Sequence, residues 1–264
     1  MRAKTSAIWL YAVVPAAQRG APAGLTGVAG EPVRLITGER LSVLVGDVPL
    51  SDFDHDPLRD HLEDLRWLEE AARAHHRVID AAARSSDVVP LRFATLYHDE
   101  AAVRAVLSER LEDFTSALQR IAGRTEWGVK AYVDPDMLAA PADEPESDQN
   151  TPGTAYLRRR RAQRQGQRDA RQRAAQRAEE IHTALADLAV GALQHPPQDA
   201  RLAAYRGWMI LNGSYLVDDE RAQEFAAAVD SCDQRFPEVR LELSGPWPAY
   251  SFTTEDRERQ GEQS

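Results

Sequence analysis

The first half of the chain consists of short apolar runs separated by stretches with helical periodicity. Residues 7–14, AIWLYAVV, form an apolar run that ends at Pro15, which indicates a buried strand. Two further strands are predicted at Val33–Thr37 and Leu41–Gly46, because the connection Gly38-Glu39-Arg40 suits a tight hairpin.

Two helices and two strands are predicted to follow the hairpin. The pair Asp56-Pro57 starts a helix that runs to about Arg84, because the Asp side chain caps free backbone N–H groups and proline fits the first turn. Asp87–Tyr97 is predicted to be a strand whose proline sits at an edge or bulge, and a second helix comes after it. Thr125–Asp134 alternates apolar and polar residues, which is typical of a strand with one wet face. This order of elements predicts an α+β fold.

The second half is predicted to contain a loop, one long helix, and two strands around a shorter helix. Residues 135–153 hold four prolines and a block of acids, a composition typical of a surface loop. A strand at Tyr205–Val217, a helix capped by Asp218 and a last strand at Val239–Leu243 end the pattern. The long helix is expected at about 154–193, and its second part carries a heptad-like apolar seam formed by Ala174, Ala178, Ile181, Leu185, Leu188 and Ala192.

Length and composition suit two small globular domains. The chain has 264 residues, of which 43% are hydrophobic and 28% charged. We predict an N-terminal α+β domain at 1–124, a C-terminal α+β domain at 125–252 that includes the acidic loop and the long helix, and a disordered polar tail at 253–264.

Charge and cysteine content narrow the function classes. The formal net charge of −10 gives no general attraction to nucleic acid or anionic lipid. The single cysteine, Cys232, rules out an internal disulfide and a cysteine-based zinc cage, and it favours a cytoplasmic protein. The N-terminal stretch resembles a signal peptide, but its β-rich IWLYAVV is better explained as the first strand. No apolar run approaches the roughly 18 residues that a membrane span needs.

The residues that carry chemistry do not combine into a catalytic motif. Asp52, Asp54, His55 and Asp56 have hard-metal character, but Asp56 is already assigned as a helix cap and the others lie in a solvated turn. His75 and His76 are neighbours on a helix and point about 100° apart, so they cannot bind one metal together. The sequence has no HExxH, GxSxG, P-loop or GxGxxG motif. We therefore expect neither an enzyme nor a cofactor or metal site.

An arginine run opens the long helix. Residues 158–177 carry a net charge of +8, and Arg158, Arg159, Arg160 and Arg161 form a candidate basic surface. Such a stretch could bind phosphates. The alternative is a solvated helix attracted to acids of the chain itself or of a protein partner, and it is favoured because the run lacks interleaved aromatics apart from Tyr156.

The ending GPWPAYSF places Trp247 between two prolines, which fix its backbone. This stretch could be a binding platform or a plug that covers the end of a domain. We favour the plug, with Trp247, Tyr250 and Phe252 buried, because large rings after a strand usually belong to a core. On this interpretation Trp247→Ala is expected to destabilise the C-terminal domain by roughly 3–5 kcal/mol.

Several stretches, taken together, resemble one protein family over nearly the whole chain. They are YAVVPA, LRWLEEAARAHHRVIDAAARSSDVVPLRFATLYHDEAAVRAVL, LRRRR, WMILNGSYLVDDERAQEFAAAV and LELSGPWPAYSF. They resemble the GvpL/GvpF family of gas vesicle proteins, and Val88–Phe93, Asn212–Asp218 and Gly245–Phe252 are the most distinctive parts. The chain departs from the family pattern at Ala94, where a glycine is common, and in the longer, more acidic stretch 135–153.

The resemblance implies a fold and a function. The fold would have two α+β domains, a ferredoxin-like N-terminal part and a C-terminal part of related topology. The protein would be a non-enzymatic, cytoplasmic, vesicle-associated accessory or minor structural protein, without cofactors. It would bind the hydrophobic shell subunit and other gas vesicle accessory proteins and would support nucleation and assembly of the shell. The candidate partner-contact or signature residues are Arg92, Phe93, Asn212, Tyr215, Trp247, Tyr250 and Phe252. The alternative function is a nucleic-acid or regulatory binding module that uses the arginine-rich helix.

Overall fold

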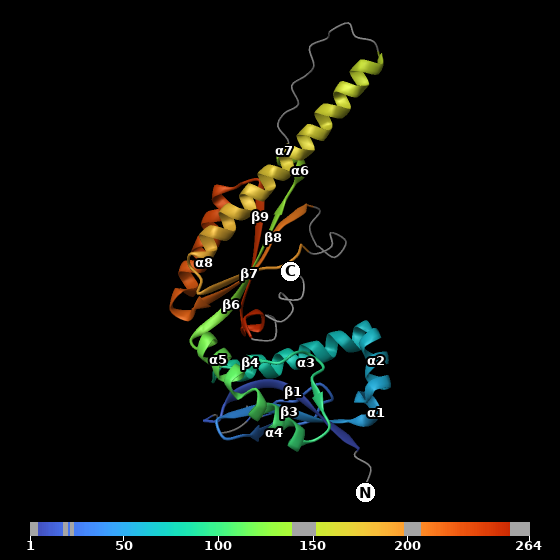
Figure 1. Ribbon diagram of the computed structural model, residues 1–264, viewed down its shortest axis with the longest axis vertical. Helices are drawn as coiled ribbons and strands as arrows, with labels where there is room; N and C mark the ends of the chain where they lie inside the picture. The colour runs from blue at the N-terminus through green and yellow to red at the C-terminus, as the bar shows by residue number, and fades with distance from the viewer. Residues whose placement is uncertain (1–4, 18–20, 22–23, 139–151, 198–206, 254–264) are drawn as a thin grey trace. The chain divides into compact units, whose positions relative to one another are not determined.

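The computed structural model describes residues 5–17, 21, 24–138, 152–197 and 207–253, with backbone alone at 135–136 and 152–159 (Figure 1). The chain divides into two compact units. The first unit comprises Met1–Thr125 and Trp247–Ser264, and the second comprises Glu126–Pro246. The sequence placed 247–252 in the C-terminal domain, whereas in the structure the chain from Trp247 onward belongs to the first unit.

The sheet of the first unit has the strand order β2-β3-β1-β4, with β5 also paired to β1. The predicted hairpin is present, since β2 and β3 pair antiparallel with Thr37 opposite Ser42. The strands are β1 (Ser6–Pro15), β2 (Arg34–Thr37), β3 (Leu41–Pro49), β4 (Val89–Pro90) and β5 (Leu96–Tyr97).

Strand β1 is buried on both faces, which explains its unbroken apolar run. The pairing of β1 with β3 shifts register between Leu10 and Ala12, so Tyr11 lies at a bulge. Trp9 and Tyr11 pack with residues of helix α3 (Leu65–Ala83), including Val78. Leu10 and Val13 face a small hollow on the other side that is also lined by α4 (Glu100–Glu109) and α5 (Leu111–Ile121).

The helix predicted from Asp56 to Arg84 is divided in two, and Asp56 is not its cap. Helix α1 (Leu50–Phe53) is followed by α2 (His55–Glu63) and then by α3. Asp54 caps α2 by accepting a hydrogen bond from the His55 N–H at 2.8 Å. Asp64 has extended backbone and caps α3 through the N–H groups of Arg66 and Trp67. The chain therefore turns where a second capping aspartate interrupts the helical pattern.

The stretch Asp87–Tyr97 is also divided, into β4 and β5 with a turn between them. Ala94 has φ +62°, and it is the one non-glycine residue with positive φ in the described part of the chain. An uninterrupted strand cannot pass through that conformation. Ala94 is also one of the two places at which the sequence departs from the pattern of the family it resembles.

The second unit has the element order of a ferredoxin-like fold, β-α-β-β-α-β. Its strands lie in the order β7-β8-β6-β9. Numbered from the start of each unit, both sheets have the order second, third, first and fourth strand. In the first unit the connection from β1 to β2 contains no helix among its described residues. The second unit contains β6 (Arg124–Val133), α6 (Pro135–Leu138), α7 (Pro152–Ala186), β7 (Gly191–Gln194), β8 (Trp208–Asp218), a 3-10 turn (Asp219–Arg221), α8 (Ala222–Arg235) and β9 (Val239–Trp247).

Two predicted boundaries in this unit are wrong. The long helix ends at Ala186 rather than Leu193, and Gly191–Gln194 pairs with β8 as a strand. Apolar residues continue past the helix end, so the seam did not reveal the change of structure. Asp218 makes no side-chain cap, because a 3-10 turn precedes α8.

The core of the second unit lies between its sheet and the helices α7 and α8. Ile181 and Leu185 of α7 and Phe225 of α8 pack with Val129 of β6 and Tyr215 of β8. The fold as a whole is α+β, as predicted, with a long helix in the second unit.

Candidate functional site

Helix α3 has one face in the core of the first unit and one face outside it. Ala71, His75 and Val78 are buried, whereas Arg73 and His76 are exposed. This division follows the 3.6-residue period of the helix, since residues three and four apart share a face. The outward face of α3 therefore offers a guanidinium and an imidazole group next to an apolar core.

The C-terminal segment 247–253 is fastened to the first unit by polar contacts. The Tyr250 hydroxyl and His76 Nδ1 share a hydrogen bond of 2.7 Å, and their rings meet edge to face with centroids 5.2 Å apart. Arg120 Nη1 donates to the carbonyl oxygen of Phe252 at 3.1 Å, and the Phe252 ring is buried. These contacts bring a segment distant in sequence against α3 and α5.

Two hollows flank the Tyr250–His76 pair, and together we call them the α3 groove. One, of about 280 Å³, is lined by Pro90, Leu91, Arg92 and Phe93 together with His76 and Tyr250. The other, of about 510 Å³, is lined by Arg73, Arg77, Asp80 and Trp247 and by the same pair. The groove thus combines aromatic surface with several guanidinium groups.

The turn between β4 and β5 places Phe93 and Arg92 at the groove. The Phe93 ring packs edge to face on Trp9, at a centroid distance of 5.1 Å. The Thr95 hydroxyl donates to the carbonyl oxygen of Arg92 at 2.7 Å, which closes the turn. Phe93 is therefore anchored in the core while Arg92 is exposed.

His75, next to the groove, is a neutral core residue. Its side chain is 2% exposed. Trp9 Nε1 donates to His75 Nδ1 at 3.0 Å, so Nε2 carries the proton and donates to the carbonyl oxygen of Leu91 at 3.1 Å. Burial lowers the pKa of His75 to about 4. Both ring nitrogens are engaged, which leaves this histidine a structural role.

Four of the seven signature residues meet at the α3 groove: Arg92, Phe93, Trp247 and Tyr250. Phe252 lies in the same segment and is buried. Asn212 and Tyr215 belong to β8 in the second unit. The sequence analysis did not select the groove residues Arg73, His76 and Arg77. The signal was present, because the periodicity of the helix places them on its polar, exposed face.

Asn212 and Tyr215 serve the second unit internally. The Asn212 side-chain amide donates to the carbonyl oxygen of Pro196 at 3.1 Å. The Tyr215 ring is fully buried and its hydroxyl lies 3.0 Å from His182 Nδ1. Burial raises the pKa of Tyr215 well above its usual range and also raises that of the Cys232 thiol. Tyr215 and Cys232 are therefore buried in this unit, whereas Asn212 is half-buried.

The plug interpretation of GPWPAYSF is correct for Phe252 and wrong for Trp247. The Trp247 side chain is 48% exposed and borders the α3 groove. Gly245, two residues earlier, has φ +124°, and a Cβ there would lie 2.9 Å from the carbonyl oxygen of Glu126. The glycine permits this close approach of backbones, after which the chain leads to an exposed tryptophan.

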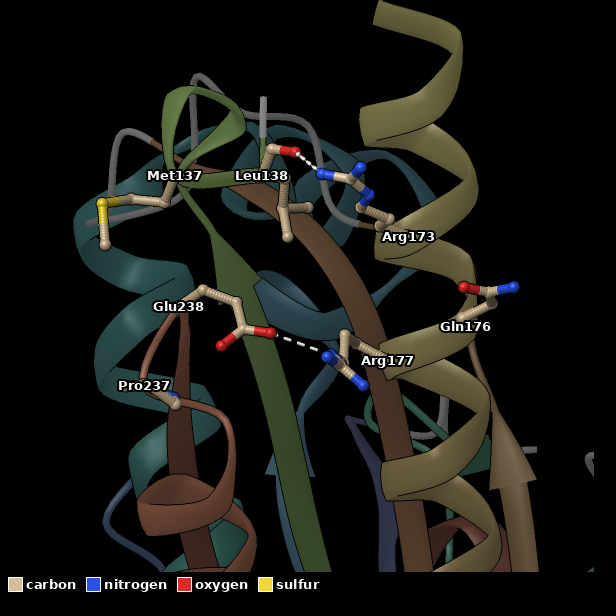
Figure 2. A pocket seen from close by; sticks show the side chains of 7 residues that line it. All are labelled: Met137, Leu138, Arg173, Gln176, Arg177, Pro237 and Glu238. Carbon is tan, nitrogen blue, oxygen red and sulfur yellow. Dashed lines mark hydrogen bonds and ion pairs between the residues drawn. The ribbon is translucent and has the colours of Figure 1, made fainter. Parts of the chain in front are cut away.

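A further hollow, of about 480 Å³, lies in the second unit beside α7 (Figure 2). Figure 2 shows Arg177 directed at Glu238 and Arg173 directed at the carbonyl oxygen of Leu138, with Nε–Oε1 and Nη1–O distances of 2.8 Å each. Arg177 also lies over the ring of Phe236. These two arginines therefore join α7 to α6 and to the turn before β9.

The candidate basic surface lies on the first half of α7. Arg160 and Arg161 are exposed, and for Arg158 and Arg159 the structure describes the helical backbone alone. The acids Asp143, Glu144, Glu146 and Asp148, and the tail 254–264, lie outside the described residues.

Neither a metal-binding cluster nor a membrane-spanning helix is present among the described residues. Within the described residues, no group of three or more His, Cys, Asp and Glu side chains is placed to hold a metal ion, and this includes the Asp52–Asp56 cluster. No described helix combines the length and apolar character that crossing a bilayer requires.

Comparison with known proteins supplies the family. A family model described as "Gas vesicle synthesis protein GvpL/GvpF" matches residues 7–254. The chain is 42% identical to gas vesicle protein L of Streptomyces sp. (strain CB03234), over 92% of this chain and 91% of that protein. It is 30% identical to gas vesicle protein F of the same strain, over 92% of this chain and 98% of that protein.

A solved structure shows the same fold. The crystal structure of the gas vesicle protein GvpF from Anabaena sp. PCC7120 superposes with a TM-score of 0.70 at 20% identity, covering 95% of this chain and 97% of that one. The likeness thus extends over both units. This chain belongs to the GvpL/GvpF family of gas vesicle proteins and has a role in gas vesicle formation.

Proposed function

We propose that this protein binds the hydrophobic shell subunit of the gas vesicle through the α3 groove and so supports nucleation and assembly of the shell. It acts as a non-enzymatic accessory or minor structural protein in the cytoplasm and on the vesicle. A shell subunit with an apolar gas-facing side is prone to aggregate before it is packed, because exposed apolar surface and unpaired strand edges associate indiscriminately. A partner that covers this surface keeps the subunit available for assembly.

The observation that carries the proposal is the exposed Trp247 at the rim of a groove built from signature residues. Tryptophan and arginine are the residue types that most often dominate binding energy at interfaces. Trp247 contributes apolar surface to one hollow, which Arg73 and Arg77 also line, and Arg92 lines the neighbouring hollow. An amphipathic segment with apolar side chains and a carboxylate fits this lining.

Co-expression with a tagged shell subunit, followed by pull-down from the soluble fraction, tests the proposal. The wild-type protein is expected to retain the shell subunit, and Trp247→Ala to retain at least tenfold less while its stability changes by about 1 kcal/mol or less. Leu65→Ala is a matched control, because Leu65 is 78% exposed at the start of the same helix, outside the groove. If the wild-type protein does not retain the shell subunit, the proposed binding function is overturned. If Trp247→Ala retains as much shell subunit as the wild type, the assignment of the binding site to the α3 groove is overturned.

We also infer an L-type role, since identity to the L protein of the Streptomyces strain exceeds identity to its F protein, 42% against 30%. A strain lacking the L protein is expected to regain vesicles when it receives this chain, and a strain lacking the F protein is not. Rescue of the second strain alone would reverse the assignment.

A further inference from the structure

The first half of α7 has few contacts within the described part of the chain that would stabilise it as a helix. Figure 1 shows it projecting beyond the sheet of the second unit. The helix has 35 residues, and the side chains from Arg160 to Gln165 are all exposed. A helix that is polar all round needs many stabilising side-chain pairs or an outside partner. One such pair, Gln165 with Asp169, is present in the described part of this half.

Four arginines form a single stripe along this helix. Arg161, Arg164, Arg168 and Arg171 follow each other at steps of three, four and three residues, so they share one face and extend over about 15 Å. All four are exposed. No carboxylate in the described part of the chain pairs with Arg161, Arg164 or Arg168, while Arg171 lies over the ring of Trp208. Like charges at this spacing destabilise a helix, which favours a partner of opposite charge.

The arginines that the fold uses internally lie on a different side of the helix. Arg173 and Arg177 point to Leu138 and Glu238 in Figure 2, four residues apart from each other. At 100° per residue they lie about 140° or more from Arg168 around the helix axis. The stripe is therefore separate from the contacts that Arg173 and Arg177 make within the unit.

Helix α2 carries the complementary pattern. Asp56, Asp60 and Glu63 are exposed and follow at steps of four and three, so they share a face of a helix that buries none of its residues. Arg59 makes ion pairs of 3.5 and 3.8 Å with Asp56 and Asp60. Such exposed pairs contribute little and are easily exchanged. Three carboxylates at helical spacing match three guanidinium groups at helical spacing.

We propose that two copies of this chain associate, with the α2 face Asp56–Asp60–Glu63 of one copy docked on the α7 stripe Arg161–Arg164–Arg168 of the other. The two surfaces differ, and each copy carries both, so the contact is heterologous and can repeat from copy to copy into a ring or a row. A nucleic acid is the less favoured ligand, because the stripe lacks interleaved aromatics and the chain carries a net charge of −10.

Sedimentation velocity over a range of protein and salt concentrations tests this contact. The wild-type protein is expected to self-associate at low ionic strength and to dissociate as salt is added, because exposed charge pairs are screened. The triple variant Arg161→Glu, Arg164→Glu, Arg168→Glu is expected to associate at least tenfold more weakly, and so is Asp56→Lys, Asp60→Lys, Glu63→Lys. An equimolar mixture of the two variants is expected to associate again, because their reversed faces complement each other.

The controls separate this contact from other uses of the stripe. Arg40→Glu with Arg84→Glu changes net charge in the same direction at exposed sites elsewhere and is expected to leave association intact. Circular dichroism of each variant reports whether it has folded. A wild-type protein that stays monomeric at every concentration, a mixture that fails to associate, or salt-sensitive binding of a DNA duplex without self-association would each overturn the proposal.

Discussion

The central strands of the two sheets, β1 and β6, occupy the same place in the strand order but differ in how they are covered. Strand β1 is apolar throughout because α3 packs on one face and α4 with α5 on the other. Strand β6 mixes apolar and polar residues: Val129 and Ala131 pack with α7 and α8, Lys130 between them is half-buried, and Tyr132 is buried. The neighbours that pack on each face of a strand, rather than its place in the strand order, determine its hydrophobic pattern.

The largest expected effect comes from breaking the packing of α7 on the second sheet. Leu185→Ala removes a fully buried side chain of α7 and is expected to lower the stability of the second unit by about 2–5 kcal/mol. Hydrogen exchange, resolved by peptide, should show lost protection in β6 and β8 and unchanged protection in β1 and β3. Equal loss in both units would mean that the two sheets are not independent in stability.

The stability of the first unit, whose sheet is covered on both faces, should depend on pH through His75. Its pKa is about 4 in the fold, against about 6.5 in the unfolded chain, so the folded state binds fewer protons. Its contribution, roughly 3 kcal/mol, is present above pH 6.5 and is lost as the pH falls towards 4. Urea unfolding of His75→Gln should show a flatter dependence over this range, whereas exposed His98→Gln should follow the wild type. Parallel curves for His75→Gln and wild type would contradict the assignment.

A third test concerns the connection between β1 and β2. The Tyr11 hydroxyl donates to Glu31 Oε1 at 2.6 Å and accepts from the Val28 N–H at 3.0 Å. Tyr11→Phe removes both bonds and is expected to cost about 1–3 kcal/mol. Tyr97→Phe, on β5, is the matched control and should change the melting temperature little. Equal effects of the two changes would show that the polar contact does not fasten the connection.

The smallest expected effect is a gain in stability. Ala94 has φ +62°, in the left-handed region that glycine enters without strain. Ala94→Gly is therefore expected to raise the free energy of unfolding by about 1 kcal/mol. Ala83→Gly, at the exposed end of α3, should lower it, as glycine usually does in a helix. A loss of stability in Ala94→Gly would mean that methyl packing outweighs the backbone strain.

The sequence predicted those elements whose pattern is local. The apolar run of β1, the hairpin to β3 and the seam through Ile181 and Leu185 all depend on neighbouring residues. The break at Asp64 was missed because the apolar spacing continues across it. Strand β7 was missed because Leu188 and Ala192 extend the helical seam beyond the helix.

The candidate site was predictable in its residue types but not in its assembly. Trp247 and Tyr250 were selected as signature residues, yet the contact of Tyr250 with His76 joins positions 174 residues apart. The hydrophobic periodicity of a sequence cannot reveal a contact between such distant positions. The exposure of Trp247 was missed because a ring between prolines has the same sequence signal whether it faces a core or solvent.

The return of the chain to the first unit makes the second unit an insertion. Residues 247–253 contribute Tyr250 and the buried Phe252 to a core that otherwise ends at Thr125. During synthesis the second unit leaves the ribosome whole before the first unit receives its last residues. The α3 groove, which needs Trp247 and Tyr250, is therefore completed only after the whole second unit has been made, and a nascent chain cannot engage a partner there before that point.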